Sequence, residues 1–417
     1  MRQRASNIFM IGWEYPPHNS GGLGVACEGM TQSLAGLQNH IYFTLPYSLQ
    51  IPVGHMDVLE CSDPSWFVDG QTGAPPFSVY SAVAQAQQTL FNSHEVTVDA
   101  LQVLPSSELE NKVDRYAELV TDAGLAHRAD VDVIHAHDWM SFPAALKLSQ
   151  KIKKPFVAHI HSTELDRIPN GYGSQYIMQT EYEGMQHATR VVAVSYYTKN
   201  LLVEKYGIDP NKIDVVHNGI APLSAAEQRK ITAEKFAPDR PVVVFMGRLT
   251  MQKGADYFLA VAKKVLEKIP DALFIIAGDG DMYHELLLST ASKRLSASLL
   301  FSGFVRDTQR NKLLNRADVF VMPSLSEPFG LVALEAAQRN TPVLVSKNSG
   351  VSEVMPSSIS VDFWDIDKMA LEIIRLLKKP DVHSQIITSQ LSDLQQVTWE
   401  KAALRLREVY KRAFRGA

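Results

Sequence analysis

The sequence has few cysteines, little net charge and no long apolar run. Cys27 and Cys61 are its only cysteines, too few for a disulfide framework or a four-thiolate zinc site. The formal net charge of −4 offers no basic field to nucleic acid or an anionic membrane, so an anionic ligand needs a local positive site. The apolar run from Ile8 to Trp13 stops at Glu14, short of a secretory or membrane-spanning segment. We therefore expect a cytoplasmic protein.

The 417 residues, 46% of them hydrophobic, suffice for two or three domains with large cores. Short apolar runs alternate with longer amphipathic segments, which predicts parallel sheets covered by helices on both faces. The expected strands are Asn7–Gly12, Ile41–Pro46, Val131–Ala136, Phe156–His161, Val191–Val194, Asp214–His217, Val242–Met246, Leu273–Ala277, Leu299–Ser302, Val319–Met322 and Val343–Ser346.

The alternation of strands and helices is interrupted between residues 219 and 240, where the sequence is polar and charged. We interpret this stretch as a linker between a Rossmann-like domain at 1–218 and a second at 241–398. The region 47–104 reads as a long insertion in the first domain. In doubly wound sheets, ligands bind beyond the carboxyl ends of the strands, so residues that follow strands are the candidates for a site.

Glycines follow the first expected strand, in the string Gly21-Gly22-Leu23-Gly24 that opens a helix. Such a loop lets backbone N–H groups approach a phosphate. The spacing is not that of a dinucleotide fingerprint, and no acidic residue ends the second strand to hold a ribose. The alternative is a loop whose backbone simply requires glycine.

Two cations follow the first strand of the second domain, within the string Gly247 to Gly254. Arg248 can grip phosphate oxygens in a bidentate manner, and Lys253 supplies a mobile point charge. In a net acidic protein this loop is a candidate clamp for a diphosphate. An ordinary solvated basic loop is the alternative.

Two carboxylates lie eight residues apart in the string from Glu327 to Glu335, where Gly330 frees the backbone at a helix start. A carboxylate accepts two hydrogen bonds, which suits the vicinal hydroxyls of a ribose or a hexose. Taken singly, Glu327 could be a charge that favours the helix N-terminus, and Glu335 could lie on a solvated helix face.

Two His-x-His strings end neighbouring strands, with His135 and His137 on one and His159 and His161 on the other. Alternation along a strand places both members of each string on one face. Three readings stay open. The imidazoles could bind a metal in a hydrolase, they could be core residues satisfied by their neighbours, or they could contact a sugar.

Taken together, these strings resemble the retaining glycosyltransferases of the GT-B fold, family 4, with similarity to bacterial and archaeal glycogen and starch synthases. The strings that carry the resemblance are Gly247-Arg248-Leu249, Gln252-Lys253-Gly254, Ala277-Gly278-Asp279-Gly280, Glu327 through Glu335, Gly21-Gly22-Leu23 and His135-Ala-His137-Asp138-Trp139. The resemblance implies an α/β fold of two Rossmann-like domains whose parallel sheets face a deep crevice. It also implies that the segment 399–417 packs back on the first domain as a helix.

The resemblance also assigns roles. Arg248 and Lys253 would hold the donor diphosphate, Glu327 would face the transferred sugar, and His161 would contact a hexose hydroxyl near the anomeric centre. These four form the expected catalytic set. The expected donor-binding set is Gly21, Gly22, Arg248, Lys253, Phe304, Val305, Phe329, Gly330, Leu331 and Glu335. Within it, Glu335 would accept the ribose hydroxyls, and the backbone at Phe304 and Val305 would receive the base. No metal site and no cofactor are expected.

The implied function is a retaining, metal-independent hexosyltransferase that uses a nucleoside diphosphate sugar, with UDP- or ADP-glucose the expected donor. The acceptor would be a sugar, a glucan or another hydroxyl compound, bound by variable loops such as 47–104. Alternatives are an epimerase or a phosphorylase of the same fold, a metal-dependent hydrolase built on the His-x-His strings, and an inactive sugar-nucleotide-binding protein. The Glu327–Glu335 string argues against the epimerase, and no pyridoxal-binding lysine is identified for a phosphorylase.

Overall fold

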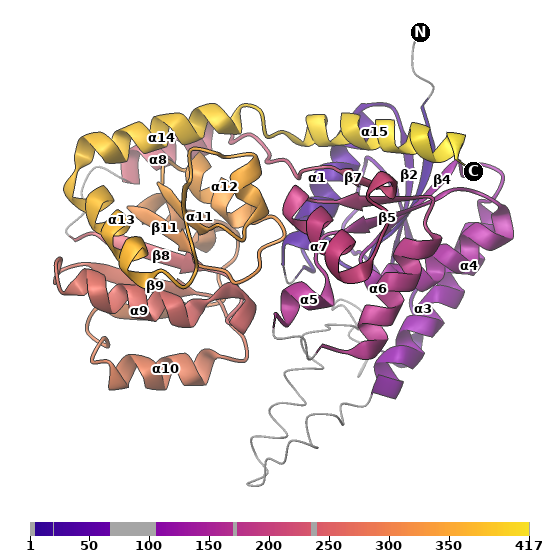
Figure 1. Ribbon diagram of the computed structural model, residues 1–417. Helices are drawn as coiled ribbons and strands as arrows, with labels where there is room; N and C mark the ends of the chain where they lie inside the picture. Colours follow the sequence, from indigo (N-terminus) through magenta and orange to yellow (C-terminus); the bar gives the residue numbers. More distant parts are fainter. Residues whose placement is uncertain (1–4, 20, 67–105, 170–172, 235–239, 417) are drawn as a thin grey trace. The chain divides into compact units, whose positions relative to one another are not determined.

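The computed structural model describes residues 5–19, 21–66, 106–169, 173–234 and 240–416 (Figure 1). The chain divides into two compact units, each with its own sheet. Unit 1 comprises Met1–Leu165, Gly173–Gly219 and Trp399–Ala417, and unit 2 comprises Asp166–Tyr172 and Ile220–Thr398. Most of the expected insertion at 47–104 falls outside the described residues.

The sheet of unit 1 has seven parallel strands in the order β3-β2-β1-β4-β5-β6-β7. Their bounds are β1 Asn7–Ile11, β2 His40–Leu45, β3 Asp57–Glu60, β4 Val133–His137, β5 Phe156–Ile160, β6 Arg190–Ala193 and β7 Ile213–Val215. Strands β4 and β5 are buried along their whole length, as expected where helices cover both faces of a parallel sheet.

The helices of unit 1 are α1 Gly22–Gly36, α3 Ser106–Ala126, α4 Phe142–Ile152, α5 Glu164–Arg167 (which spans the division between the units), α6 Gln175–His187, α7 Tyr196–Tyr206 and α15 Trp399–Arg415. Short 3-10 turns are η1 Pro64–Trp66, η3 Trp139–Ser141 and η4 Pro210–Lys212.

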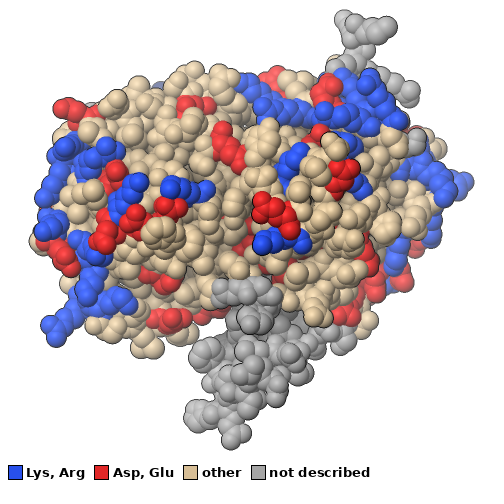
Figure 2. Space-filling model, viewed as in Figure 1, with Lys and Arg blue, Asp and Glu red and all other residues tan. Residues whose placement is uncertain are grey.

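Helix α15 belongs to unit 1 although it follows all of unit 2 in the sequence. It packs against α1, where the Trp399 indole lies so close to Gly29 that a Cβ there would come within 2.2 Å of it. Its buried side carries Ala402, Ala403, Leu406, Val409, Tyr410 and Ala413. Lys401, Arg405, Arg412 and Arg415 are exposed, and Figure 2 shows blue side chains gathered along this helix. The amphipathic pattern thus explains why the helix returns to this core.

The sheet of unit 2 has six parallel strands in the order β10-β9-β8-β11-β12-β13. Their bounds are β8 Val242–Met246, β9 Leu273–Ala277, β10 Leu299–Gly303, β11 Val319–Met322, β12 Val343–Ser346 and β13 Ile359–Val361. The helices are α8 Ala225–Glu234, α9 Ala255–Leu266, α10 Tyr283–Ser292, α11 Asp307–Arg316, α12 Leu331–Gln338, α13 Ile366–Lys378 and α14 Pro380–Leu394, with 3-10 turns η5 Met251–Lys253 and η6 Gly350–Glu353.

Each sheet reverses its winding direction once. In unit 1 the chain builds β1, β2 and β3 outward in one direction and then continues with β4 on the other side of β1. In unit 2 the reversal lies between β8 and β11. Loops that leave the carboxyl ends of two such strands diverge and open a crevice, which is where doubly wound sheets bind ligands.

Four segments differ from the sequence-based expectation. Strand β3 pairs with β2 in the sheet of unit 1, although it lies within the stretch interpreted as an insertion. The stretch 219–240, expected to be a linker, contains α8, and the part from Ile220 onward belongs to unit 2. Helix α14 was not predicted because its Gln- and Ser-rich sequence hides its buried residues Gln390 and Leu394. Strand β13 was also missed, because three residues are too few to display a period.

Candidate functional site

The loops after β8 and β9 in unit 2 are held together by glycines. A Cβ at Gly278 would lie 1.8 Å from the carbonyl oxygen of Gly247, and one at Gly280 would lie 2.5 Å from that of Leu249. Gly254, just before α9, has φ +69°, and a Cβ there would lie 2.2 Å from the carbonyl oxygen of Pro323. These contacts pack the loop that bears Lys253 against its neighbours on both sides.

Lys253 and Glu327 meet at the point where the sheet of unit 2 reverses. Lys253 ends η5 after β8, and Glu327 lies in the loop after β11. The Lys253 Nζ is 2.8 Å from Glu327 Oε2, and the Ser324 hydroxyl donates to the same oxygen over 3.2 Å. The Lys253 side chain is 23% exposed and that of Glu327 only 8%. The pair is therefore an enclosed ion pair at the ligand-binding edge of the sheet.

The backbone at Glu327 is fixed by the segment that follows β12. Its N–H donates to the carbonyl of Asn348 and its carbonyl accepts from the N–H of Gly350, both over 2.9 Å. The loop is also joined to the lysine loop, because the Gln252 amide donates to the Ser326 carbonyl over 3.1 Å. A side chain held in this way needs little reorganisation to act on a ligand.

Glu335 lies on α12, the helix that begins just after Gly330. Its Oε1 is 3.3 Å from Arg310 Nη1 on α11, while its enclosed Oε2 has no hydrogen-bond partner among the described residues. The side chain is 18% exposed. Burial raises the pKa of this carboxyl, and the charges of Arg310 and Arg339 oppose that rise. Glu335 is thus a carboxylate with unused acceptor capacity.

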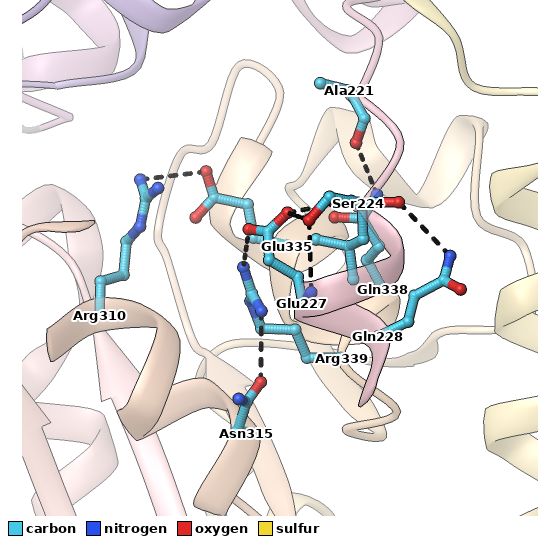
Figure 3. A network of polar contacts seen from close by, with 10 residues as sticks. Ala221, Ser224, Glu227, Gln228, Arg310, Asn315, Glu335, Gln338 and Arg339 are labelled. Carbon is cyan, nitrogen blue, oxygen red and sulfur yellow. Dashed lines mark hydrogen bonds and ion pairs between the residues drawn. The ribbon is translucent and has the colours of Figure 1, made fainter. Parts of the chain in front are cut away.

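A second ion pair joins Arg339 to Glu227, about one helical turn beyond Glu335 (Figure 3). Arg339 Nη2 is 3.7 Å from Glu227 of α8, and its Nη1 donates to the Asn315 side chain over 3.3 Å. The backbone N–H and the hydroxyl of Ser224 both donate hydrogen bonds to Glu227 Oε2. Arg339 is only 5% exposed, so its charge is engaged mainly with Glu227.

The other expected donor-binding residues of unit 2 lie at the start of α12, just after β10 and just after β8. Phe329 is buried just before α12. Gly330, the residue immediately before this helix, has φ +101°. Phe304 and Val305 follow β10; Phe304 is 51% exposed, and the guanidinium of Arg306 lies 4.8 Å from its ring centre. Arg248 is partly exposed in the loop after β8.

In unit 1, Gly21 and Gly22 stand at the first turn of α1, after β1. Gly21 has φ −159°, an extended backbone that any residue adopts, and a Cβ there would meet open space. The alternative that the loop geometry requires glycine is therefore wrong for Gly21. Gly24 is different, because a Cβ at that position would lie 2.4 Å from the side chain of Asn19.

The four histidines form one cluster across β4 and β5, because residue 137 is in register with residue 159. His135 Nδ1 lies 2.7 Å from the hydroxyl of Tyr410 on α15, and its Nε2 lies 3.1 Å from His159 Nδ1. His137 Nδ1 lies 3.0 Å from His161 Nε2. Burial lowers the pKa of His135 to about 3 and lowers the pKa values of the other three as well. The rings are therefore neutral at pH 7.

The histidines that could be metal ligands by their spacing in the sequence also lie close together in the structure. One ring nitrogen from each of His135, His137 and His159 lies within 4.8 Å of the other two. These three rings are fully buried. His161, just beyond the end of β5, is partly exposed, and its backbone N–H donates to the Asp138 carboxylate over 2.7 Å. Asp138 has φ +56°, rare for a residue other than glycine.

The structure thus brings Lys253 and Glu327 into contact and places His161 beside His137. It adds two residues that the sequence did not single out, Arg310 and Asp138. Asp138 stood inside a quoted string and could have been found there, whereas nothing in the sequence around Arg310 indicates its position beside Glu335. How the residues of unit 1 face those of unit 2 stays a prediction.

The fold and the paired site residues define a GT-B-type enzyme of two Rossmann-like units. Two family models match the chain. Residues 79–222 match the model described as Glycosyltransferase Family 4, and residues 227–390 match the one described as Glycosyl transferases group 1. The chain therefore belongs to the family 4 glycosyltransferases of the GT-B fold, and it is a nucleotide-sugar glycosyltransferase.

Two curated relatives align over nearly the whole chain. An uncharacterized glycosyltransferase of Methanocaldococcus jannaschii is 29% identical over 97% of this chain and 97% of its own. A glycogen synthase of Mycobacterium tuberculosis is 27% identical over 98% of this chain and 95% of its own. These relatives support neither the epimerase, the phosphorylase nor the hydrolase alternative.

Solved structures agree in fold. The sucrose-phosphate synthase of Thermosynechococcus elongatus superimposes with a TM-score of 0.75 at 18% identity, covering 99% of this chain and 100% of that one. At this identity the likeness concerns the fold alone. Among the helices of the described residues, none is long and apolar enough to cross a bilayer.

Proposed function

We propose that this glycosyltransferase moves a hexose, with glucose the expected sugar, from UDP- or ADP-glucose to the hydroxyl of a sugar, a glucan or another acceptor, with retention of configuration and without a metal. The observation that carries the proposal is the Lys253–Glu327 pair at the reversal point of the sheet in unit 2. It combines a cation for the leaving diphosphate with a carboxylate for the sugar in one enclosed place.

The chemistry requires such an arrangement. Breaking the bond between sugar and diphosphate develops positive charge on the sugar and negative charge on the leaving group. Lys253 and Arg248 would stabilise the leaving group, and each well-placed charge of this kind is worth about 10²–10³ in rate. Fixed cations and the N-terminus of α12 would supply the positive potential that a metal supplies elsewhere.

Retention of configuration is part of the proposal. A leaving phosphate oxygen lies on the face of the sugar from which it departs, so it can deprotonate an acceptor that attacks on that face. His161 would hydrogen-bond a sugar hydroxyl, and Glu335 would accept the ribose hydroxyls through its unused capacity. The N–H groups around Gly330 and Leu331 would support the sugar or the phosphate, and Gly21 and Gly22 would approach the diphosphate from unit 1.

The names of relatives support the donor and acceptor classes. One GT-B neighbour, HepE of Anabaena, was solved with UDP-glucose at 16% identity and a TM-score of 0.69, and a starch synthase of Arabidopsis thaliana was solved with ADP and acarbose. The glycogen synthase relative supports a glucan as one acceptor to be tried. A cytoplasmic location is part of the proposal, supported by the two free, buried thiols of Cys27 and Cys61.

The test is a donor screen followed by product analysis. Thermal unfolding of the protein is measured with UDP-, ADP- and GDP-glucose, because a ligand at about 100 times its Kd stabilises the folded state by about 2.7 kcal/mol. The donor that stabilises is then incubated with maltose or a glucan, with and without EDTA, and the product is examined by proton NMR. An α-linked product formed equally with EDTA is expected. A β-linked product, or loss of transfer with EDTA, would contradict the proposal.

A further inference from the structure

Arg310 of α11 makes the direct ion-pair contact with Glu335 (Figure 3). Its Nη1 lies 3.3 Å from Glu335 Oε1, and its side chain is 32% exposed. The other nearby arginine, Arg339, is tied to Glu227 and Asn315 instead. The two arginines therefore have different tasks: Arg339 joins α12 to α8, and Arg310 faces the carboxylate that would bind the ribose.

The contact leaves acceptor capacity on the carboxylate. Arg310 occupies Oε1, and Oε2 has no partner among the described residues. A hydroxyl that donates to this oxygen would replace no existing bond. Because Arg310 holds one end of the carboxylate, the group does not have to be ordered from several rotamers when a ligand binds.

We propose that Arg310 is a positioning residue for donor binding, which holds Glu335 in the orientation that receives the ribose hydroxyls of the nucleoside diphosphate sugar. The proposal rests on the ribose role given to Glu335 in the proposed function. It predicts that loss of Arg310 weakens nucleotide affinity while the chemical step keeps its rate at saturating donor. A purely structural arginine would affect stability and leave affinity unchanged.

The charge balance at Glu335 adds a pH signature. Burial raises the pKa of Glu335, and the charges that oppose this are Arg310 of α11 and Arg339 of α12, the latter shared with Glu227 of α8. Without the charge of Arg310, which opposes the effect of burial, the pKa of Glu335 rises further. The carboxylate then takes up a proton at higher pH, so the affinity defect should be larger at pH 6 than at pH 8.

The experiment measures the binding of UDP, ADP and GDP by calorimetry at pH 6, 7 and 8, together with KM and kcat for the corresponding sugar donor. Arg310→Gln should weaken binding of the best nucleotide about tenfold at pH 7, with kcat within about twofold. Arg310→Lys should recover most of the affinity, because it keeps the charge. Lys312→Gln is the matched control, since Lys312 is an exposed cation on the same helix and its removal should change affinity less than twofold.

Glu335→Gln separates this proposal from the one on which it rests. If Glu335→Gln leaves nucleotide affinity unchanged, the ribose role is wrong and the proposed function of Glu335 fails. If Glu335→Gln weakens binding and Arg310→Gln does not, the positioning role alone is overturned. In the double variant, Arg310→Gln should add little to the effect of Glu335→Gln, because both act through one carboxylate. Additive losses would contradict the proposal.

Discussion

Lys253 and Glu327 lie 74 residues apart in the sequence, yet their charged groups are 2.8 Å apart in the structure. Each follows one of the two strands between which the sheet of unit 2 reverses its direction. An enclosed ion pair of this kind is costly to break, since removal of one partner leaves the other charge buried. A bound sugar diphosphate would give each partner a new contact while they remain together.

Replacement of Glu327 should impair the chemical step more than donor binding. In Glu327→Gln, the amide keeps the shape of the side chain but loses the charge that contacts Lys253 and that would face the sugar in the proposed function. Turnover should fall about 10²-fold, with a change in donor Kd below about threefold. Steady-state kinetics and calorimetry measure the two quantities. Glu267→Gln, an exposed glutamate in the same unit, should change neither. A loss confined to donor affinity would refute the assigned role.

Gly254 should be irreplaceable for a geometric reason. Its φ of +69° and the approach of the Pro323 carbonyl would force the backbone beside Lys253 to move in Gly254→Ala. We expect a loss of about 1–3 kcal/mol in the free energy of unfolding and a large loss of turnover. Gly207→Ala is the control, because Gly207 has a similar φ of +65° with open space around it. Gly207→Ala should lower the free energy of unfolding and leave turnover unchanged. Equal losses of turnover in both variants would show that the contact with Pro323 does not matter.

The buried histidines should make the protein sensitive to acid. The unfolded chain takes up a proton on His135 as the pH falls through about 6.5, whereas the folded chain does not do so until about pH 3. The free energy of unfolding therefore decreases as the pH is lowered from about 6.5 toward 3. For His135 alone the decrease between pH 7 and pH 5 is about 2 kcal/mol.

Urea unfolding of His135→Asn and of the wild type at pH 7, 6 and 5 tests this. The variant should be less stable at pH 7, where it leaves Tyr410 without its imidazole partner, and should lose less stability on acidification. His187→Gln, an exposed histidine in the same unit, should show the wild-type slope. Equal slopes in all three proteins would contradict the prediction.

His161 should behave differently from His135, because it lies beyond the end of its strand and is partly exposed. In His161→Ala, the sugar contact of the proposed function is lost, and turnover should fall about tenfold or more with a small change in the urea midpoint. His187→Ala provides the baseline for a histidine away from the site. A drop in stability with normal turnover would assign His161 to the core instead.

Much of the fold could be predicted from the sequence where strands are buried on both faces. Strands β8, β9, β11 and β12 begin and end at the predicted residues, because their apolar runs are bounded by polar loops. Strand β13 and helix α14 could not be predicted, since neither shows the period of its structure.

The candidate residues could be named from the sequence, but their contacts could not. Lys253 and Glu327 were identified from glycine-rich strings, yet their pairing depends on the order of strands in space. Arg310 could not be recognised, because α11 is rich in polar residues and resembles a solvated helix. Only the packing of α11 near α12 brings its guanidinium to Glu335.

The most direct test of the account is the rate of sugar transfer in the presence of EDTA for the wild type, Lys253→Ala, Arg248→Ala and Lys264→Ala. Lys264 is a half-exposed lysine on α9 whose partner is Asp367, so its loss should leave turnover unchanged. We expect the wild type to keep its rate in EDTA, and Lys253→Ala and Arg248→Ala each to lose about 10²-fold or more while remaining folded. Near wild-type turnover in either variant, or loss of the wild-type rate in EDTA, would contradict the account.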